Sequence, residues 1–239
     1  MKKFLLVLCL IPLSGICQTK NVISATRLHP KSEKTLELEK ALTSHAQKFH
    51  TGDWKWRVFE IVSGPEVGGY HIVEGFNTWT TLDSRGNLGA EHAADLQKNI
   101  SPLTLGRGTT DFFLFREDLS SVQPTDYSDK ISITHIYPKP GFIGRIEEEI
   151  KKDKKLWEAS GENVAVYQSH FSGEGRIGVA YRHKQGWKEK ENDFRKPFKE
   201  RYIAMFGEEV YNQRLKMIQE TVNRTWGEML TFRADLSSK

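Results

Sequence analysis

Six polar side chains lie in the first and second predicted strands of two similar units of the chain, and their types are suited to holding a small molecule. They are Arg27, Glu60, His135, Tyr137, Gln168 and His170. Because side chains alternate across a strand, Arg27 shares one strand face with Ile23 and Ala25. The other five likewise share faces with apolar residues, so we predict that the six line a ligand pocket. The structural alternative is that Arg27 with Glu60, and His135 with Gln168, satisfy one another at a strand edge or between two units.

The eight histidines of the chain include no HExxH sequence, no His-x-His pair and no close group with Asp or Glu at metal-ligand spacing. The sequence therefore predicts no metal site. His45 and His50 fall on the first predicted helix, and neither has a neighbour in sequence that would make it a ligand.

Three other patterns have structural explanations. The stretch GEGRIG matches G-x-G-x-x-G, but a strand follows it where a dinucleotide site needs a helix, so we interpret it as a hairpin turn. The lysine-rich stretches 151–155 and 184–201 are interleaved with acidic residues, which is typical of a solvated face and not of a nucleic-acid site. No G-x-S-x-G sequence with a Ser-His-Asp order is present.

Hydrophobic patterning predicts two units with the same order of elements, strand, helix, two strands, helix and strand. In the first unit we expect strands at 22–28, 54–62, 70–74 and 111–116, with helices at 33–49 and 90–99 and a loop at 83–89. In the second we expect strands at 131–137, 164–171, 176–183 and 228–233, with helices at 142–159 and 194–224, the latter interrupted near Gly207.

Two internal echoes indicate that the chain contains a duplication. ISATRLHPKS, from Ile23, recurs as ISITHIYPKP, from Ile131, with five of ten residues identical. FREDLSS, from Phe115, recurs as FRADLSS, from Phe232, with six of seven identical. Matched beginnings and ends define two repeats, which we place at residues 22–121 and 129–239.

The first 17 residues have the composition of a secretory signal peptide, with Lys2 and Lys3 before an apolar run and small residues. This predicts an exported protein, periplasmic or secreted. Lipid attachment through Cys17 is the alternative, although Ile16 stands where such signals carry a small residue. The other cysteine, Cys9, also lies in this segment, so no disulfide is expected afterwards. The net charge is +4 for the whole chain and +2 once Lys2 and Lys3 are removed (33 basic against 31 acidic residues), which favours no polyanionic partner.

The element order and the duplication together resemble the dimeric α+β barrel superfamily, with both halves fused in one chain. That superfamily includes small antibiotic-biosynthesis-type and haem-degrading monooxygenases, chlorite-dismutase-like haem proteins and NIPSNAP-like proteins. The resemblance implies an α+β fold of two tandem ferredoxin-like βαββαβ units that cover each other's sheets. It also implies pockets between helices and sheet within each unit, and His92 as a haem ligand if haem is bound. A solvated helix histidine is the alternative for His92.

We therefore expect an exported protein that binds a small, mostly apolar molecule and carries no evident catalytic motif or cofactor. One alternative is a cofactor-independent monooxygenase-like or haem-handling enzyme using His135, His170 or His92. Another is an envelope-associated interaction module. No nucleic-acid partner and no membrane span after signal cleavage are expected, and the chain should be a monomeric pseudo-dimer or a loose dimer.

Overall fold

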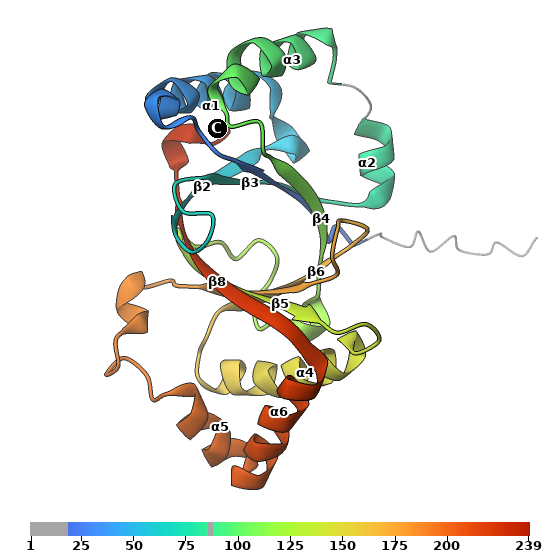
Figure 1. Cartoon of the computed structure of the whole chain (residues 1–239), viewed down its shortest axis with the longest axis vertical. Coiled ribbons are helices and arrows are strands. Elements are labelled where there is room, and N and C mark those ends of the chain that lie inside the picture. Colours follow the sequence, from blue (N-terminus) through green and yellow to red (C-terminus); the bar gives the residue numbers. More distant parts are fainter. Residues whose placement is uncertain (1–18, 86–87) are drawn as a thin grey trace, which may run out of the picture.

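A computed structural model describes residues 19–85 and 88–239 of the chain. Its centre is a closed barrel of eight antiparallel strands in the order β1-β3-β2-β8-β5-β7-β6-β4 (Figure 1). Helices cover the barrel on two opposite sides, with α1 and α3 on one and α4, α5 and α6 on the other. The fold is therefore α+β, as the sequence predicted. The predicted signal peptide lies outside the described residues.

The elements of the first half are β1 (Val22–Leu28), α1 (Thr35–Phe49), β2 (Trp56–Ser63), β3 (Tyr70–Asn77), α2 (Trp79–Arg85), α3 (Ala90–Asp95) and β4 (Thr109–Phe115). Those of the second half are β5 (Lys130–Pro138), α4 (Ile143–Ala159), β6 (Val164–Ser169), β7 (Ile177–Arg182), α5 (Phe198–Phe206), α6 (Glu208–Thr221) and β8 (Val222–Phe232). Around the barrel the first half runs β4-β1-β3-β2 and the second runs β8-β5-β7-β6, which is the same relative order.

Alternation along the strands sorts the core into an inner and two outer parts. Outward-facing residues such as Val58 and Ile72 pack against Leu38 and Leu42 of α1. A corresponding cluster joins β6 and β7 to α4. Inward-facing apolar residues from both halves, including Ile23, form three smaller clusters inside the barrel. The inner face of the barrel and much of its outer face are thus covered.

The barrel closes at two seams where strands of different halves pair. At one seam β4 pairs with β6, and at the other β2 pairs with β8. Closure leaves no unpaired strand edge, which removes the usual site of edge-to-edge association.

The echoed segments 115–121 and 232–238, which we call the latch segments, fasten these seams. In the first, the backbone N–H of Arg116 donates to the Val166 carbonyl of β6 at 2.9 Å. The hydroxyls of Ser120 and Ser121 accept from the N–H groups of Val166 and Val164 at 2.8 and 3.0 Å.

The second latch segment repeats this arrangement on the other half. Arg233 N–H donates to the Val58 carbonyl of β2 at 2.9 Å. The hydroxyls of Ser237 and Ser238 accept from the N–H groups of Val58 and Trp56, both at 2.9 Å. The C-terminus consequently lies beside α1 of the first half (Figure 1). The sequence echo therefore has a structural role, because each copy binds the second strand of the opposite half.

Several predicted element boundaries were wrong. Residues 222–224, expected to end a helix, form the beginning of the 11-residue strand β8, because they pair with residues 137 and 138 of β5. Residues 83–85, expected in a loop, belong to α2. Residues 194–197, expected to begin a helix, precede α5 and are not helical. Helical periodicity alone could not detect the first error, since the strand partner lies about 90 residues away. Among the described residues, no helix is both long and apolar enough to cross a membrane.

Candidate functional site

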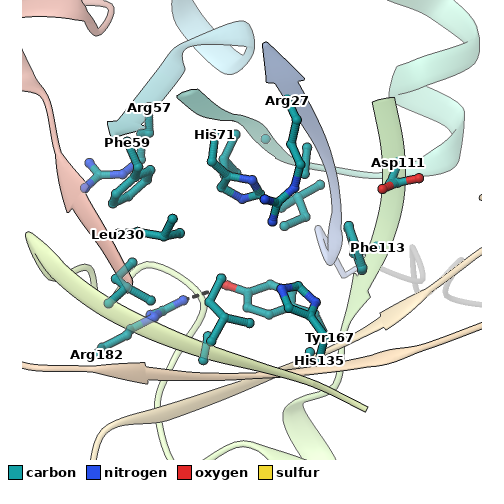
Figure 2. A pocket seen from close by; sticks show the side chains of 18 of the residues that line it. Arg27, Arg57, Phe59, His71, Asp111, Phe113, His135, Tyr167, Arg182 and Leu230 are labelled. Atoms are coloured by element: carbon teal, nitrogen blue, oxygen red, sulfur yellow. Dashed lines mark hydrogen bonds between the residues drawn. The ribbon is translucent and has the colours of Figure 1, made fainter. Parts of the chain in front are cut away.

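A cavity of about 80 Å³ lies inside the barrel and is lined by both halves of the chain (Figure 2). Its wall is mainly apolar, and the residues that form this part include Ile23, Ala25, Phe59, Val73, Phe113, Ile131, Ile133 and Leu230. This volume is enough for several water molecules or a ligand of a few heavy atoms. The resemblance implied a pocket between helices and sheet, whereas this cavity lies on the opposite, inner face of the strands.

A buried ionic cluster surrounds one part of the cavity. Glu228 of β8 is 3% exposed and accepts hydrogen bonds from both terminal nitrogens of Arg27, at 2.5 and 2.8 Å. It also accepts from Nε2 of His135 at 2.8 Å. Although burial opposes its ionisation, these partners hold the pKa of Glu228 well below its usual range.

The hydrogen bond to Glu228 settles the tautomer of His135. Since the carboxylate accepts from Nε2, the neutral ring keeps its lone pair on Nδ1, which is buried without a hydrogen-bond partner. Burial lowers the pKa of His135, and the ring stacks on Trp226 at a centroid distance of 4.0 Å. His135 is therefore a fixed, neutral base beside the cavity.

His71 of β3 is a second neutral imidazole at the cavity wall, close to Arg27 in Figure 2. Burial, followed by the nearby charge of Arg27, lowers its pKa to about 3. Its Nδ1 is buried and has no hydrogen-bond partner. Near it, Arg176 forms an ion pair with Asp111 at 2.5 Å, so both arginines in this part of the cavity face a carboxylate.

Arg57 and Arg182 line another part of the cavity, and neither has a carboxylate within ion-pair distance among the described residues. Arg182 donates to the backbone carbonyls of residues 123, 124 and 126 and to the Tyr167 hydroxyl, the last at 2.8 Å (Figure 2). Arg57 lies over the rings of Tyr127 and Phe232, at 3.9 and 4.3 Å from their centroids.

Arg57 also marks the route between the cavity and the surface. An outer cleft is lined by residues that include Lys55 and Ser237, and it shares four residues with the cavity, namely Arg57, Gly75, Phe76 and Tyr127. These four form the partition between solvent and the barrel interior. Burial lowers the pKa of Arg57, and its Nε is buried without a hydrogen-bond partner.

Of the six residues predicted to line a pocket, Arg27 and His135 line the cavity. They are not paired with Glu60 and Gln168, because both bind Glu228. Tyr137 lies at the edge of the same cluster. Its hydroxyl accepts a hydrogen bond at 3.3 Å from the indole N–H of Trp226, the residue on which His135 stacks.

Glu60 and Gln168 lie on the outer strand faces, where each accepts a hydrogen bond from the arginine of a latch segment. Arg233 donates to Glu60 at 3.4 Å, and Arg116 donates to Gln168 at 2.5 Å. Their matched positions therefore reflect the two seams. His170 is also outside the cavity, at the end of β6, where its ring contacts those of Trp79 and Phe171.

The sequence interpretation missed Glu228, His71, Arg57 and Arg182. The latch segments contained a usable indication for the first, because Asp111 and Glu228 each lie four residues before the phenylalanine that opens a latch segment. Both carboxylates pair with a cavity arginine.

His92 of α3 lies beside two histidines that the sequence placed on another element. Its ring centroid is 4.8 Å from that of His45, 5.4 Å from that of His50 and 5.3 Å from that of Phe49. An axial haem ligand needs a porphyrin-sized space against its ring. Because three rings pack around His92, this position does not fit haem.

No family model and no curated protein matches the chain. Several solved structures, however, match the chain. A candidate monooxygenase from Lactobacillus acidophilus is 10% identical with a TM-score of 0.55, over 91% of this chain and 95% of that chain. An anthrone oxidase-like protein is 13% identical with a TM-score of 0.58, over 90% and 92%. A candidate monooxygenase from Fusobacterium nucleatum is 13% identical with a TM-score of 0.53, over 88% and 91%. At these identities, the chain is shown to share their fold.

Proposed function

We propose that the barrel interior binds a small organic anion with an apolar body, such as a carboxylate or an enolate. The observation that carries this proposal is Arg57, a half-buried cation at the entrance of an apolar cavity with no ion pair among the described residues. Burying a cation without a counter-ion is unfavourable, so an anion that reaches Arg57 gains a strong electrostatic partner.

The charge balance of the cavity supports the same ligand class. Arg27 and Arg176 are neutralised by Glu228 and Asp111, whereas Arg57 and Arg182 have no carboxylate within ion-pair distance among residues 19–85 and 88–239. Arg182 already donates to four oxygens. Arg57 therefore remains the available donor. Benzoate, like any ligand larger than a few heavy atoms, enters only when the partition around Tyr127 moves outward.

The test compares benzoate with its neutral amide, benzamide, by isothermal titration calorimetry on the full chain. We expect benzoate to bind more tightly, and Arg57→Met to weaken benzoate binding at least tenfold with little effect on benzamide. Arg107→Met removes the same charge at an exposed position and should change neither affinity. Equal affinities for the two compounds, or an Arg57→Met variant that binds benzoate like the wild type, would overturn the proposal.

A second candidate function is cofactor-independent oxidation of such a ligand. It is favoured by His135, whose free Nδ1 is positioned beside the cavity by Glu228, and by structural neighbours described as candidate monooxygenases and as anthrone oxidase-like. In this reaction Nδ1 would accept a proton from the substrate, and the resulting anion would supply electrons to O2. One oxygen atom would enter the substrate and the other would leave as water.

An oxygen electrode tests this candidate with anthrone as the probe. Enzymatic turnover should consume one O2 per anthrone, and His135→Gln should reduce kcat more than KM. Oxygen uptake no faster than in buffer, or unchanged in His135→Gln, would contradict an oxidase role while leaving benzoate binding to be judged separately.

We further infer that the two halves are tandem ferredoxin-like units derived from one ancestor and that residues 1–17 direct export. The repeated sequences, the matched latch segments and the equal strand order support the first inference. The composition of the N-terminus supports the second, which is tested by the mass of the protein recovered from the periplasm or medium. A mass that retains residues 1–17 would contradict cleavage, and one increased by a diacylglyceryl group would indicate lipidation at Cys17.

A further inference from the structure

Three histidines from separate places in the first half converge outside the barrel, between the helices and the sheet. His45 lies on α1, His50 directly follows that helix, and His92 lies on α3. One ring nitrogen from each lies within 4.8 Å of the others. His45 and His50 are each 1% exposed, whereas His92 is half-buried, so the group is reachable from one side.

The hydrogen bonds of His45 and His50 fix both tautomers. Nδ1 of His45 donates to Asp95 at 2.7 Å, and Nδ1 of His50 donates to Glu74 at 2.8 Å. In a neutral imidazole with a protonated Nδ1, the lone pair is on Nε2. The two Nε2 atoms are 3.3 Å apart. Two lone pairs therefore face each other across a short gap that a shared cation would stabilise.

The gap has the dimensions of a metal site. Zinc binds imidazole nitrogen at about 2.0–2.1 Å with tetrahedral geometry, which places two ligand nitrogens about 3.3–3.4 Å apart. Nε2 of His92 is buried and has no hydrogen-bond partner, so it is available as a third ligand. To reach the same spacing, the His92 nitrogen must move toward the other two by about 1.5 Å or less, from at most 4.8 Å to about 3.3 Å. A small rotation of the His92 side chain supplies this movement.

The surroundings of the group also match those of a metal centre. Histidine ligands usually donate their second ring N–H to a carboxylate, which orients the ring and makes it a better donor to the metal. Glu74 is held in place because it also accepts from Trp56 Nε1 at 3.1 Å and from Arg85 at 3.0 Å. Trp56 stacks on His50 with a centroid distance of 3.8 Å.

The second half has a different group at the corresponding place. The residue 108 positions after His45 is Asp153, as Ile131 follows Ile23. Arg214 of α6 bridges Asp153 and Glu149 at 2.7 and 2.8 Å. An ion-pair network completes the packing there. In the first half, three imidazoles occupy the equivalent space and retain free lone pairs.

We propose that His45, His50 and His92 bind one divalent transition-metal ion, of the zinc class that prefers imidazole ligands, through their Nε2 atoms. Three protein ligands leave a fourth position for water or an exogenous ligand. The site is separate from the barrel cavity, which lies on the inner face of the same strands. It therefore does not depend on the function proposed for that cavity.

The test uses the full chain without a polyhistidine tag, stripped with a chelator and then titrated with Zn²⁺ and, separately, Co²⁺. We expect one equivalent of tightly bound metal by mass spectrometry with elemental detection, visible absorption bands of four-coordinate Co²⁺, and a higher Tm with Zn²⁺. His92→Gln should weaken zinc binding at least tenfold. His170→Gln, a half-buried histidine elsewhere, is the matched control and should bind like the wild type.

Because His45 and His50 are buried, their variants can fail through misfolding, so the wild type provides a second measurement. Zn²⁺ should shift the NMR resonances of the Nε2 atoms of all three rings and leave the His170 ring unchanged. Less than half an equivalent of bound zinc, unaltered affinity in His92→Gln, or shifts confined to other histidines would overturn the proposal.

Discussion

At the scale of single residues, Glu228 determines the character of the barrel interior. One carboxylate neutralises Arg27 and orients His135, although all three belong to different strands and Glu228 is 201 residues from Arg27. A buried ion pair adds little net stability when compared with an apolar replacement, but the loss of one partner leaves an uncompensated charge. We therefore expect that replacing Arg27 or Glu228 alone lowers the stability of the fold more than replacing both together.

This asymmetry gives a prediction for Glu228→Gln. We expect it to lower the free energy of unfolding by roughly 3–5 kcal/mol, because Arg27 loses its counter-ion in a buried site. The double variant Arg27→Met with Glu228→Gln should be more stable than Glu228→Gln alone. Urea denaturation of the wild type, both single variants and the double variant measures the coupling. Strictly additive effects would show that Arg27 and Glu228 do not compensate each other.

His71 gives a prediction about pH. Its pKa in the folded protein is about 3, whereas an unfolded histidine titrates near 6.5. Between these values the unfolded chain binds a proton that the folded chain does not. The free energy of unfolding therefore falls as pH falls, by about 1.6 kcal/mol between pH 6.5 and pH 5 for this one residue.

The variant His71→Gln should lose this contribution. The unfolding free energy is measured by urea denaturation at each pH. Its slope against pH should be smaller in the variant than in the wild type, by an amount that corresponds to up to one bound proton. Parallel plots would mean that His71 is protonated in the folded state over this range.

At the scale of elements, the latch segments give the similar short sequences of the two halves the same structural role. Each places two serine hydroxyls on backbone N–H groups of the strand across the seam. Each also aims one arginine at the outer face of that strand. Glu60 and Gln168, which alternation alone made candidates for a pocket, act as acceptors in these seams.

Ser237→Ala and Ser120→Ala should each lower the free energy of unfolding by about 1–3 kcal/mol. Both serines are 4% exposed, and their removal leaves the N–H of Val58 or Val166 buried without an acceptor. Ser84→Ala, on the exposed face of α2, is the control and should have little effect. A latch variant as stable as that control would show that water replaces the hydroxyl.

At the scale of the whole molecule, closure of the barrel makes the two halves depend on each other. Each half alone would expose the edges of two strands and the apolar residues that now face the interior. Exposed edges and large apolar patches promote association. The cavity itself exists only when both halves contribute their inner faces.

Division of the chain between Val122 and Ser128 tests this dependence. Either half expressed alone should aggregate or form a self-dimer, and co-expression should restore a soluble heterodimer, as measured by size-exclusion chromatography with light scattering. A soluble monomeric half with a cooperative unfolding transition would contradict the dependence.

Local features were predictable because they depend on backbone geometry. Alternation along a strand fixes which side chains share a face, so Arg27 and His135 were correctly placed together with apolar neighbours. The α+β class followed from the same patterning. The region around Arg224 could not be assigned in this way, because its strand conformation depends on pairing with β5.

The sequence by itself thus determined the repeats, most strand and helix positions and the faces that each strand presents. Only the tertiary structure decided which face would enclose a cavity, which carboxylate would meet Arg27, and that His45, His50 and His92 would converge. The physical reason is that strand faces are set by bonds between neighbouring residues. Partners across a closed barrel, or between a helix and a sheet, are set by packing over long separations in the chain.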